Sequence, residues 1–151
     1  MSQLLTILIS MLPIIELKGA IPIAIFQYNL PWWQAYIFGI LGSMISALLI
    51  LLLLGIISNW LIKVSPFFRK FFDWLFNRTR SKHAKRFEKY EELLLLILSA
   101  IPVPILGGVW TAALIAFIFG VPTWKAFWYI FAGTIIAGAI FTFGALGFIR
   151  L

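Results

Sequence analysis

Apolar residues fill two long parts of the chain, and a polar segment lies between them. The first apolar part covers about residues 2–63 and the second about residues 91–150. Each part begins with a segment that prolines and glycines interrupt and continues with an uninterrupted apolar run. About 20 apolar residues suffice to cross a bilayer as a helix. The pattern predicts an all-α integral membrane protein that forms one membrane domain, residues 1–151.

The uninterrupted runs predict two long transmembrane helices, from Trp33 to about Ile62 and from Trp124 to Phe148. The interrupted segments precede them, at residues 2–30 and 91–119. The second interrupted segment starts with Glu91-Glu92. Because acids favour a helix N-terminus, we expect a helix to begin there.

Prolines and glycines are expected to break both interrupted segments, because proline lacks a backbone donor and glycine relaxes the backbone. Each break allows the chain either to continue across the membrane or to turn back within it. The breaks are expected at Pro13, Gly19 and Pro22 in the first segment, and at Pro102, Pro104 and Gly107-Gly108 in the second.

The polar segment, about residues 64–90, predicts an amphipathic basic linker on the cytoplasmic side of the cell membrane. Its apolar residues between Phe67 and Phe76 recur on one helical face, which is typical of a helix lying in the membrane interface. Nine of the twelve Lys and Arg residues lie between Lys63 and Lys89, which the positive-inside rule places near cytoplasmic anionic lipid. The net charge of +7 therefore indicates membrane lipids as partners, and no nucleic acid.

The two halves of the chain resemble each other. Pro31-Trp-Trp-Gln-Ala-Tyr-Ile-Phe-Gly-Ile-Leu-Gly42 aligns with Pro122-Thr-Trp-Lys-Ala-Phe-Trp-Tyr-Ile-Phe-Ala-Gly133. Upstream, Leu12-Pro13 and Gly19 align with Ile101-Pro102 and Gly108 once a two-residue shift is allowed. Paired halves with Pro- and Gly-interrupted segments point to a transport site where the repeats meet.

Two topologies fit this repeat. If the interrupted segments cross fully, four spans form, both termini lie in the cytoplasm and the repeats are parallel. If each segment turns back as a re-entrant hairpin, each half crosses once, the repeats are inverted and the interrupted segments meet near the midplane. About 30 residues provide either one helix of about 45 Å or two arms of about 20 Å, so length leaves both open.

Composition excludes several kinds of site. The chain is 63% apolar and 11% charged, whereas soluble domains are roughly 45–50% apolar. It has no cysteine, which excludes disulfides and thiolate metal sites, and its one histidine lies among the charges of the linker. With no nucleophile–base pair, metal-ligand cluster or phosphate-binding loop, we expect no enzyme activity and no cofactor.

The stretch from Leu12 to Pro22 carries the candidate chemistry. Glu16 is the only acid deep in an apolar segment, where an ionisable side chain is costly and points to function. Burial disfavours the charged form of a carboxylate, which suits a residue that exchanges a proton for a cationic substrate. Lys18 either forms an ion pair with Glu16 at a hairpin turn or takes a phosphate or carboxylate together with freed backbone N–H groups.

Further residues from both interrupted segments are expected at the substrate and proton site. The acid and the base would supply charge, the prolines and the glycine would shape the segments, and an aromatic residue and a threonine would line the region. The candidate set is Glu16, Lys18, Gly19, Pro22, Pro102, Pro104, Trp110 and Thr111.

These motifs resemble the small multidrug export protein family, a group of short bacterial and archaeal membrane proteins that is distantly similar to the DedA/VTT group. The resemblance rests on Leu12–Pro22, Ile101-Pro-Val-Pro104 and Val109-Trp-Thr-Ala-Ala-Leu-Ile-Ala116, and it covers nearly the whole chain. The family continues its Pro-Leu-Pro with Gly-Thr-Gly, whereas Ile105-Leu106-Gly107-Gly108 follows here and provides no threonine hydroxyl.

The resemblance implies export or translocation across the membrane. Similarity to the DedA/VTT group implies paired re-entrant hairpins and translocation of lipids or polyprenyl phosphates, and so favours the hairpin topology. Three hypotheses follow: a proton-coupled exporter of small compounds, cations included, through Glu16; a translocase of an anionic lipid that uses Lys18 and the basic linker; and a non-transporting membrane scaffold that depends on the helix at Phe67–Phe76. Because so few helices can hardly enclose a path within one subunit, we also expect a homo-oligomer.

Overall fold

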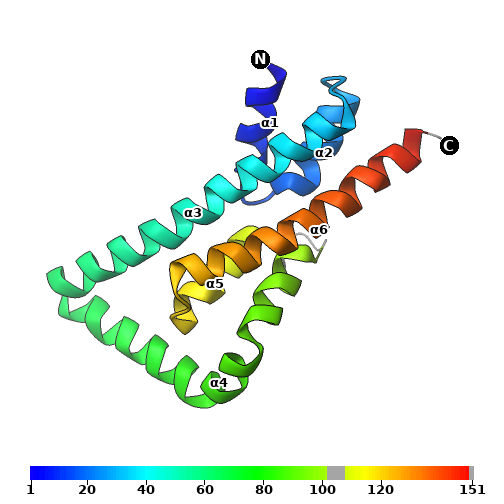
Figure 1. The fold of residues 1–151 in the computed structure, drawn as a ribbon. Helices are drawn as coiled ribbons and strands as arrows, with labels where there is room; N and C mark the ends of the chain where they lie inside the picture. The colour runs from blue at the N-terminus through cyan, green and yellow to red at the C-terminus, as the bar shows by residue number, and fades with distance from the viewer. Residues whose placement is uncertain (102–107, 150–151) are drawn as a thin grey trace.

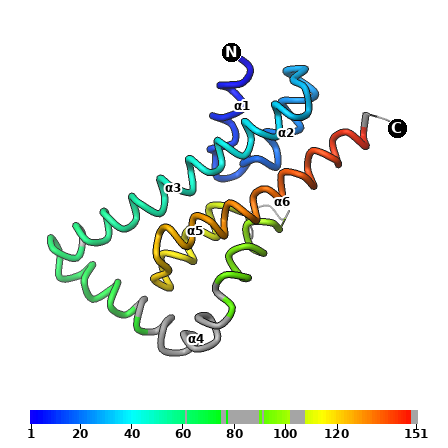
Figure 2. The backbone as a smooth tube through the Cα atoms, in the orientation of Figure 1, coloured from blue at the N-terminus to red at the C-terminus, as the bar shows by residue number. Residues whose placement is uncertain are grey.

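The computed structural model describes residues 1–101 and 108–149, apart from the side chains of residues 61, 75–76, 78–89, 91 and 149. Pro102 and Pro104, two of the predicted site residues, lie outside the described residues. The described part of the chain is helical throughout, with short connections (Figures 1 and 2). Its helices are α1 (Ser2–Ser10), α2 (Glu16–Phe26), α3 (Trp32–Val64), α4 (Pro66–Ala100), α5 (Val109–Phe119) and α6 (Thr123–Ile149).

The two long apolar helices, α3 and α6, are each long and apolar enough to cross a membrane. They contain 33 and 27 residues, which corresponds to about 50 Å and about 40 Å of helix. They pack against each other, and Figure 1 shows that they run in opposite directions. The predicted long helices at Trp33–Ile62 and Trp124–Phe148 are confirmed to within two residues at each end.

A helical hairpin of α1 and α2 packs against the first half of α3. Figure 1 shows α1 leading away from the N-terminus and α2 returning toward the start of α3. Only residues 11–15 separate the two helices, and both contact α3. The predicted break at Pro13 falls in this turn and is confirmed. We call α1, the turn and α2 the first hairpin.

The predicted breaks at Gly19 and Pro22 are wrong, because both residues lie inside α2. The Gly19 N–H donates a normal helical hydrogen bond to the Ile15 carbonyl, at 3.0 Å. Pro22 cannot donate to the carbonyl of Lys18, but the loss of one bond does not end a helix whose neighbours hold it in place. The buried face of α2, with Leu17 among its side chains, provides that support.

The connection from α3 to α4 is a single extended residue. Ser65 has φ −136° and ψ 125°, and Pro66 then opens α4, where its fixed φ suits a first helical turn. The predicted amphipathic segment Phe67–Phe76 is helical, but α4 continues without interruption to Ala100. The prediction that a helix begins at Glu91-Glu92 is therefore wrong. No proline or glycine lies between Pro66 and Ala100, so nothing in the polar segment stops the helix.

A second hairpin forms from the last part of α4 and from α5. The Gly108 N–H donates to the Leu98 carbonyl at 2.7 Å, so the chain returns to the end of α4 just before α5 begins. Figure 1 shows α5 beside α4, leading back toward the start of α6. Gly120, with φ 74°, caps α5 in the left-handed conformation that glycine favours. The predicted end at Phe119 and the turn that follows are confirmed.

The same contact joins each hairpin to the long helix of its own half. In the first half, a Cβ on Gly42 would overlap the Ile7 carbonyl and the Ser10 side chain. In the second half, a Cβ on Gly133 would overlap the Ser99 side chain. The two glycines are equivalent in the sequence alignment of the halves. Small residues at these positions let the helices approach closely.

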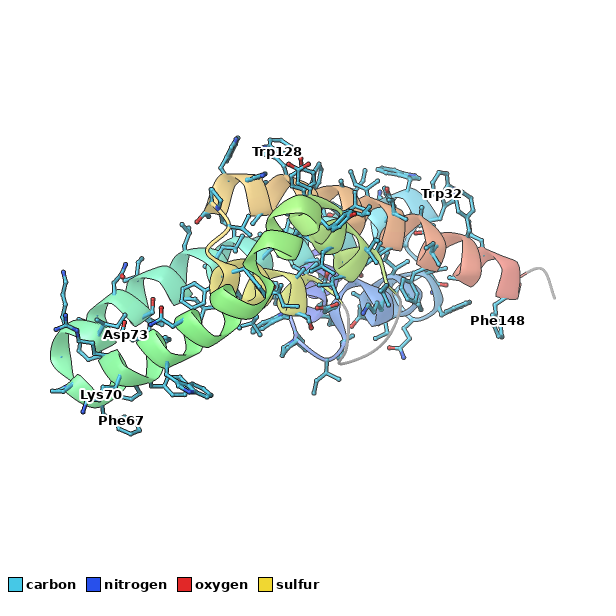
Figure 3. The ribbon with its side chains drawn as sticks, turned by 90° about the horizontal axis from the view of Figure 1, so that it is seen from below. Trp32, Phe67, Lys70, Asp73, Trp128 and Phe148 are labelled. Carbon is cyan, nitrogen blue, oxygen red and sulfur yellow. The ribbon has the colours of Figure 1, made fainter. Side chains whose placement is uncertain are left out.

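The outer surface of the long helices is apolar. Trp32, Trp128 and Phe148 point away from the helices (Figure 3), and they are 53%, 48% and 79% exposed. Leucines and isoleucines along α3 are exposed in the same way. Soluble proteins rarely expose a contiguous apolar surface of this kind. The surface agrees with the membrane location that the composition indicates.

Candidate functional site

Glu16 is the first residue of α2 and lies at the turn of the first hairpin. The residue is 3% exposed. Its φ of 46° falls in the left-handed region, which is uncommon for residues other than glycine. A backbone held in this region stores strain, and it persists only where surrounding contacts fix it. At Glu16, the contacts of the side-chain carboxylate hold the backbone in this conformation.

The carboxylate of Glu16 contacts the N-terminus of α5, which belongs to the second hairpin. Its Oε1 accepts a hydrogen bond from the Trp110 backbone N–H at 3.3 Å. Gly108, which precedes α5, has φ 122°, and a Cβ there would overlap the carboxylate. A helix N-terminus offers free N–H groups and a positive partial charge, so it favours a carboxylate at this place. Glu16 therefore joins the two hairpins.

Lys18 forms an ion pair with Glu16. Its Nζ lies 3.7 Å from Oε2, and the two side chains are 10% and 4% exposed. Residues two apart do not face each other on a regular helix. The two side chains can meet here because the backbone at Glu16 is left-handed and not that of a regular helix. Of the two possibilities that the sequence left open, the structure has the ion pair. Pairing also accounts for a lysine in an apolar region, since a buried charge is tolerated when it is paired.

Trp110 links the acid to an apolar pocket. Its backbone N–H binds Glu16, and the residue lines a pocket of about 430 Å³ between α3 and α5. The indole Nε1 of Trp110 is buried and has no hydrogen-bond acceptor among the described residues. Ligand pockets typically have this size and this apolar character. The lining residues are Met11, Ser46, Leu49, Ile50, Leu53, Leu54, Trp110 and Leu114.

Among the described residues, the remaining candidates Gly19, Pro22 and Thr111 make no hydrogen bond or ion pair with the Glu16 carboxylate. Gly19 packs against the preceding turn of its own helix, where a Cβ would overlap Ile15. Pro22 lines a separate apolar pocket of about 480 Å³ between α2 and the last part of α6. Thr111 makes no side-chain hydrogen bond to the carboxylate within the described residues. The structure thus brings together only Glu16, Lys18 and Trp110 of the described candidates.

Gly108 is a site residue that sequence reasoning did not include. Its contribution depends on its positive φ and on the close approach of Glu16, which lies in the other half of the chain. The sequence signal that could have identified Gly108 is its alignment with Gly19 in the other half. It does not identify the role, because Gly19 is an ordinary helical residue. Only the packing of the two hairpins makes Gly108 part of the site.

The immediate neighbours of the Glu16 carboxylate are hydrogen-bond donors and a cation. Metal ions require several oxygen or nitrogen ligands instead. Within residues 1–101 and 108–149 as described, no group of three or more His, Asp or Glu residues could hold a metal ion. The expectation that the protein uses no cofactor stays a prediction.

A family model agrees with the motifs. The model described as "Putative small multi-drug export protein" matches residues 16–140, from Glu16 to far along α6. No curated protein and no solved structure matches the chain. The match confirms the family that the motifs indicate, while similarity to the DedA/VTT group stays a prediction.

Proposed function

Because the chain belongs to the small multidrug export protein family, we propose that it exports small compounds, cations among them, across a membrane in exchange for protons. In this proposal the Glu16 carboxylate binds the proton and the cation in turn. The family description supports export, and two long apolar helices support a membrane location. The protein then acts as a transporter and not as an enzyme.

The observation that carries the proposal is one buried carboxylate held between two hairpins. Glu16 accepts an N–H from α5 through one oxygen and faces Lys18 with the other. Ionisable groups inside a membrane protein are costly, and they mark ion and proton pathways in transporters. Oε2 accepts no hydrogen bond among the described residues. It is therefore the oxygen at which a proton or an incoming cation binds in this proposal.

The two hairpins are proposed to be re-entrant segments that enter from opposite faces of the membrane and meet at Glu16. Helices α1, α2 and α5 have 9, 11 and 11 residues, or about 14–17 Å, roughly half of a hydrocarbon core. The opposite directions of α3 and α6 and the matching glycine contacts support an inverted repeat. Transporters with inverted repeats commonly hold their site where the broken segments meet.

In this arrangement the linker lies on the cytoplasmic side and both ends of the chain lie on the other side. Lys63, Arg69 and Lys70 are exposed where α3 gives way to α4, which suits a cytoplasmic loop. Figure 1 shows the start of α1 and the end of α6 far from this junction.

A homo-oligomer is part of the proposal, because one subunit has few helices with which to enclose a path. Gly144 and Gly147 of α6 support it, since among the described residues a Cβ on either would meet no atom of another helix within 4 Å. Such small residues allow a second helix to approach closely in a membrane.

The apolar pocket supports a lipophilic cation as the substrate. A compound with an apolar body and one positive charge can place the body against Trp110 and Leu114 and the charge near Glu16. The cation would then compete with Lys18 for Oε2. Translocation of an anionic lipid has less support, because it requires Lys18 to leave Glu16 and bind a phosphate.

The experiment is a transport assay in proteoliposomes with and without a pH gradient. The test substrates are a lipophilic cation and a labelled polyprenyl phosphate. The variants are Glu16→Gln and Lys18→Gln, with Asp73→Asn on the exposed face of α4 as the matched control. Glutamine keeps an oxygen that can accept the Trp110 N–H, so Glu16→Gln removes the charge while it retains that hydrogen bond.

The proposal expects gradient-driven movement of the cation in the wild type and in Asp73→Asn. In Glu16→Gln, movement should fall to the level of empty liposomes. Movement of polyprenyl phosphate that only Lys18→Gln abolishes would replace the exporter by a lipid translocase. If folded protein moves neither substrate and Glu16→Gln behaves like the wild type, the proposal is contradicted and a membrane scaffold takes its place.

A further inference from the structure

Two polar contacts occupy equivalent positions in the two halves of the chain. In the first half, the Gln3 Nε2 donates to the Gln34 Oε1 at 3.1 Å. In the second half, the Lys125 Nζ and the Glu92 Oε1 lie 3.1 Å apart. The alignment of Pro31 with Pro122 pairs Gln34 with Lys125, and the alignment of Leu12 with Ile101 pairs Gln3 with Glu92. The same contact is thus neutral in one half and ionic in the other.

Each contact ties the first arm of a hairpin to the first turns of a long helix. Gln3 lies on α1 and Gln34 on α3, while Glu92 lies on α4 and Lys125 on α6. Because α3 and α6 run in opposite directions, their first turns lie toward opposite ends of the molecule (Figure 1). The glycine contacts at Gly42 and Gly133 lie deeper along the same helices.

We infer that these two contacts are latches that close the two entrances to the Glu16 site, an amide latch at Gln3–Gln34 and an ionic latch at Glu92–Lys125. The inference rests on the proposed function, since it concerns access to the same site. Separation of α1 from α3 would open the site from the face where the N-terminus lies. Separation of the last part of α4 from α6 would open it from the face where the linker lies.

The difference in chemistry gives the two entrances different sensitivities. The side chains of Lys125 and Glu92 are 39% and 50% exposed, so dissolved ions reach the pair and screen its attraction. A hydrogen bond between two neutral amides has no net charge to screen. The Tyr129 hydroxyl also hydrogen-bonds to Glu92, whereas Phe38 occupies the aligned position in the first half. Salt should therefore loosen the ionic latch and leave the amide latch unchanged.

The test measures opening directly, with the full chain in nanodiscs and no substrate. Hydrogen exchange of the backbone amides of residues 92–100 and of α1 is compared at low and at high salt. High salt should speed exchange in residues 92–100 by about two- to five-fold, the range expected for loss of an exposed ion pair. Exchange in α1 should not change.

Two double variants exchange the chemistry of the latches. Glu92→Gln with Lys125→Gln gives the second half an amide pair, and salt should then have no effect on residues 92–100. Gln3→Glu with Gln34→Lys gives the first half an ion pair, and α1 should then respond to salt. An equal response at both ends of the wild type, or a response that survives in the amide variant, overturns the inference.

The same variants separate this inference from the proposed function. If salt-dependent hydrogen exchange follows the ion pair from one half to the other and neither test substrate is transported, the latch inference holds and the exporter function fails. If transport depends on Glu16 and salt-dependent hydrogen exchange does not follow the ion pair, the exporter function holds and the latch inference fails.

Discussion

At the residue scale, Glu16 and Lys18 depend on each other, because each would be a buried unpaired charge without its partner. Removing one member of a buried ion pair typically costs about 3–5 kcal/mol, whereas replacing both can be nearly neutral. We expect Lys18→Met to lower the free energy of unfolding by about 3–5 kcal/mol. Adding Glu16→Gln to this variant should restore most of the loss. Denaturant unfolding in detergent measures both changes, and losses that simply add would contradict the coupling.

Gly108 should tolerate no side chain. Its φ of 122° and the approach of the Glu16 carboxylate both exclude a Cβ. Gly108→Ala should lower the free energy of unfolding by about 1–3 kcal/mol and weaken the proposed export, because it forces Glu16 away from α5. Gly55→Ala is the control, since a Cβ at Gly55 would meet no atom of another helix within 4 Å in the described part of the chain. Equal thermal stability of the two variants would show that Gly108 does not hold the carboxylate.

The sequence predicts the importance of Glu16 because it is the only acid deep in an apolar segment. It does not predict the partners of Glu16. The pairing with Lys18 depends on one left-handed backbone angle, and the bond to Trp110 depends on how two distant hairpins pack. Neither is encoded in local periodicity. At Pro22 the sequence predicts a break that does not form, because the tertiary contacts of α2 keep the helix intact.

At the scale of elements, the equivalent glycines Gly42 and Gly133 should both be needed for hairpin packing. Alanine at either position would push the hairpin away from its long helix. We expect Gly42→Ala and Gly133→Ala to lower the free energy of unfolding by about 1–3 kcal/mol each, the usual cost of overpacking. Gly55→Ala, at an open position of α3, should change it little. Unfolding in detergent compares the three, and a loss in only one half would contradict equivalent packing.

The contact between α4 and α6 should be insensitive to mild acid. The Tyr129 hydroxyl and the Lys125 ammonium hold the pKa of Glu92 below its ordinary value of 4.5. A carboxyl group with a lowered pKa stabilises the fold above its ordinary pKa and loses this effect as the pH falls through the lowered value. The difference in Tm between the wild type and Glu92→Gln should stay constant from about pH 6 to about pH 8 and shrink as the pH falls below the ordinary pKa of 4.5. A difference that changes near neutral pH would contradict this assignment.

Most helix positions follow from apolar periodicity and from turn residues. Helices α3 and α6 begin directly after Pro31 and Pro122, and α5 ends where Phe119 meets Gly120. The acids at Glu91-Glu92 do not mark a helix start. Helix α4 begins at Pro66 and continues through Glu92 without a new N-terminus. Local charge preferences decide a helix start only where a break precedes them.

At the scale of the whole molecule, the proposed re-entrant hairpins and a bundle of four full spans place the chain ends on different sides of the membrane. The first hairpin and α3 form one half, and the second hairpin and α6 form the other. Full crossing of the interrupted segments would place the linker and both chain ends on the same face of the membrane. Re-entrant hairpins place the linker opposite the chain ends. The membrane face on which the linker and the chain ends lie therefore distinguishes the two topologies without knowledge of the substrate.

The most direct measurement is labelling of single cysteines with a membrane-impermeant maleimide in intact cells. The chain has no cysteine of its own, so Ser2→Cys, Asn77→Cys and Phe148→Cys each introduce one reporter. Re-entrant hairpins predict labelling from outside at Ser2→Cys and Phe148→Cys, with Asn77→Cys protected until the membrane is permeabilised. Protection of all three until permeabilisation would place the linker and the chain ends on one face and contradict the re-entrant topology.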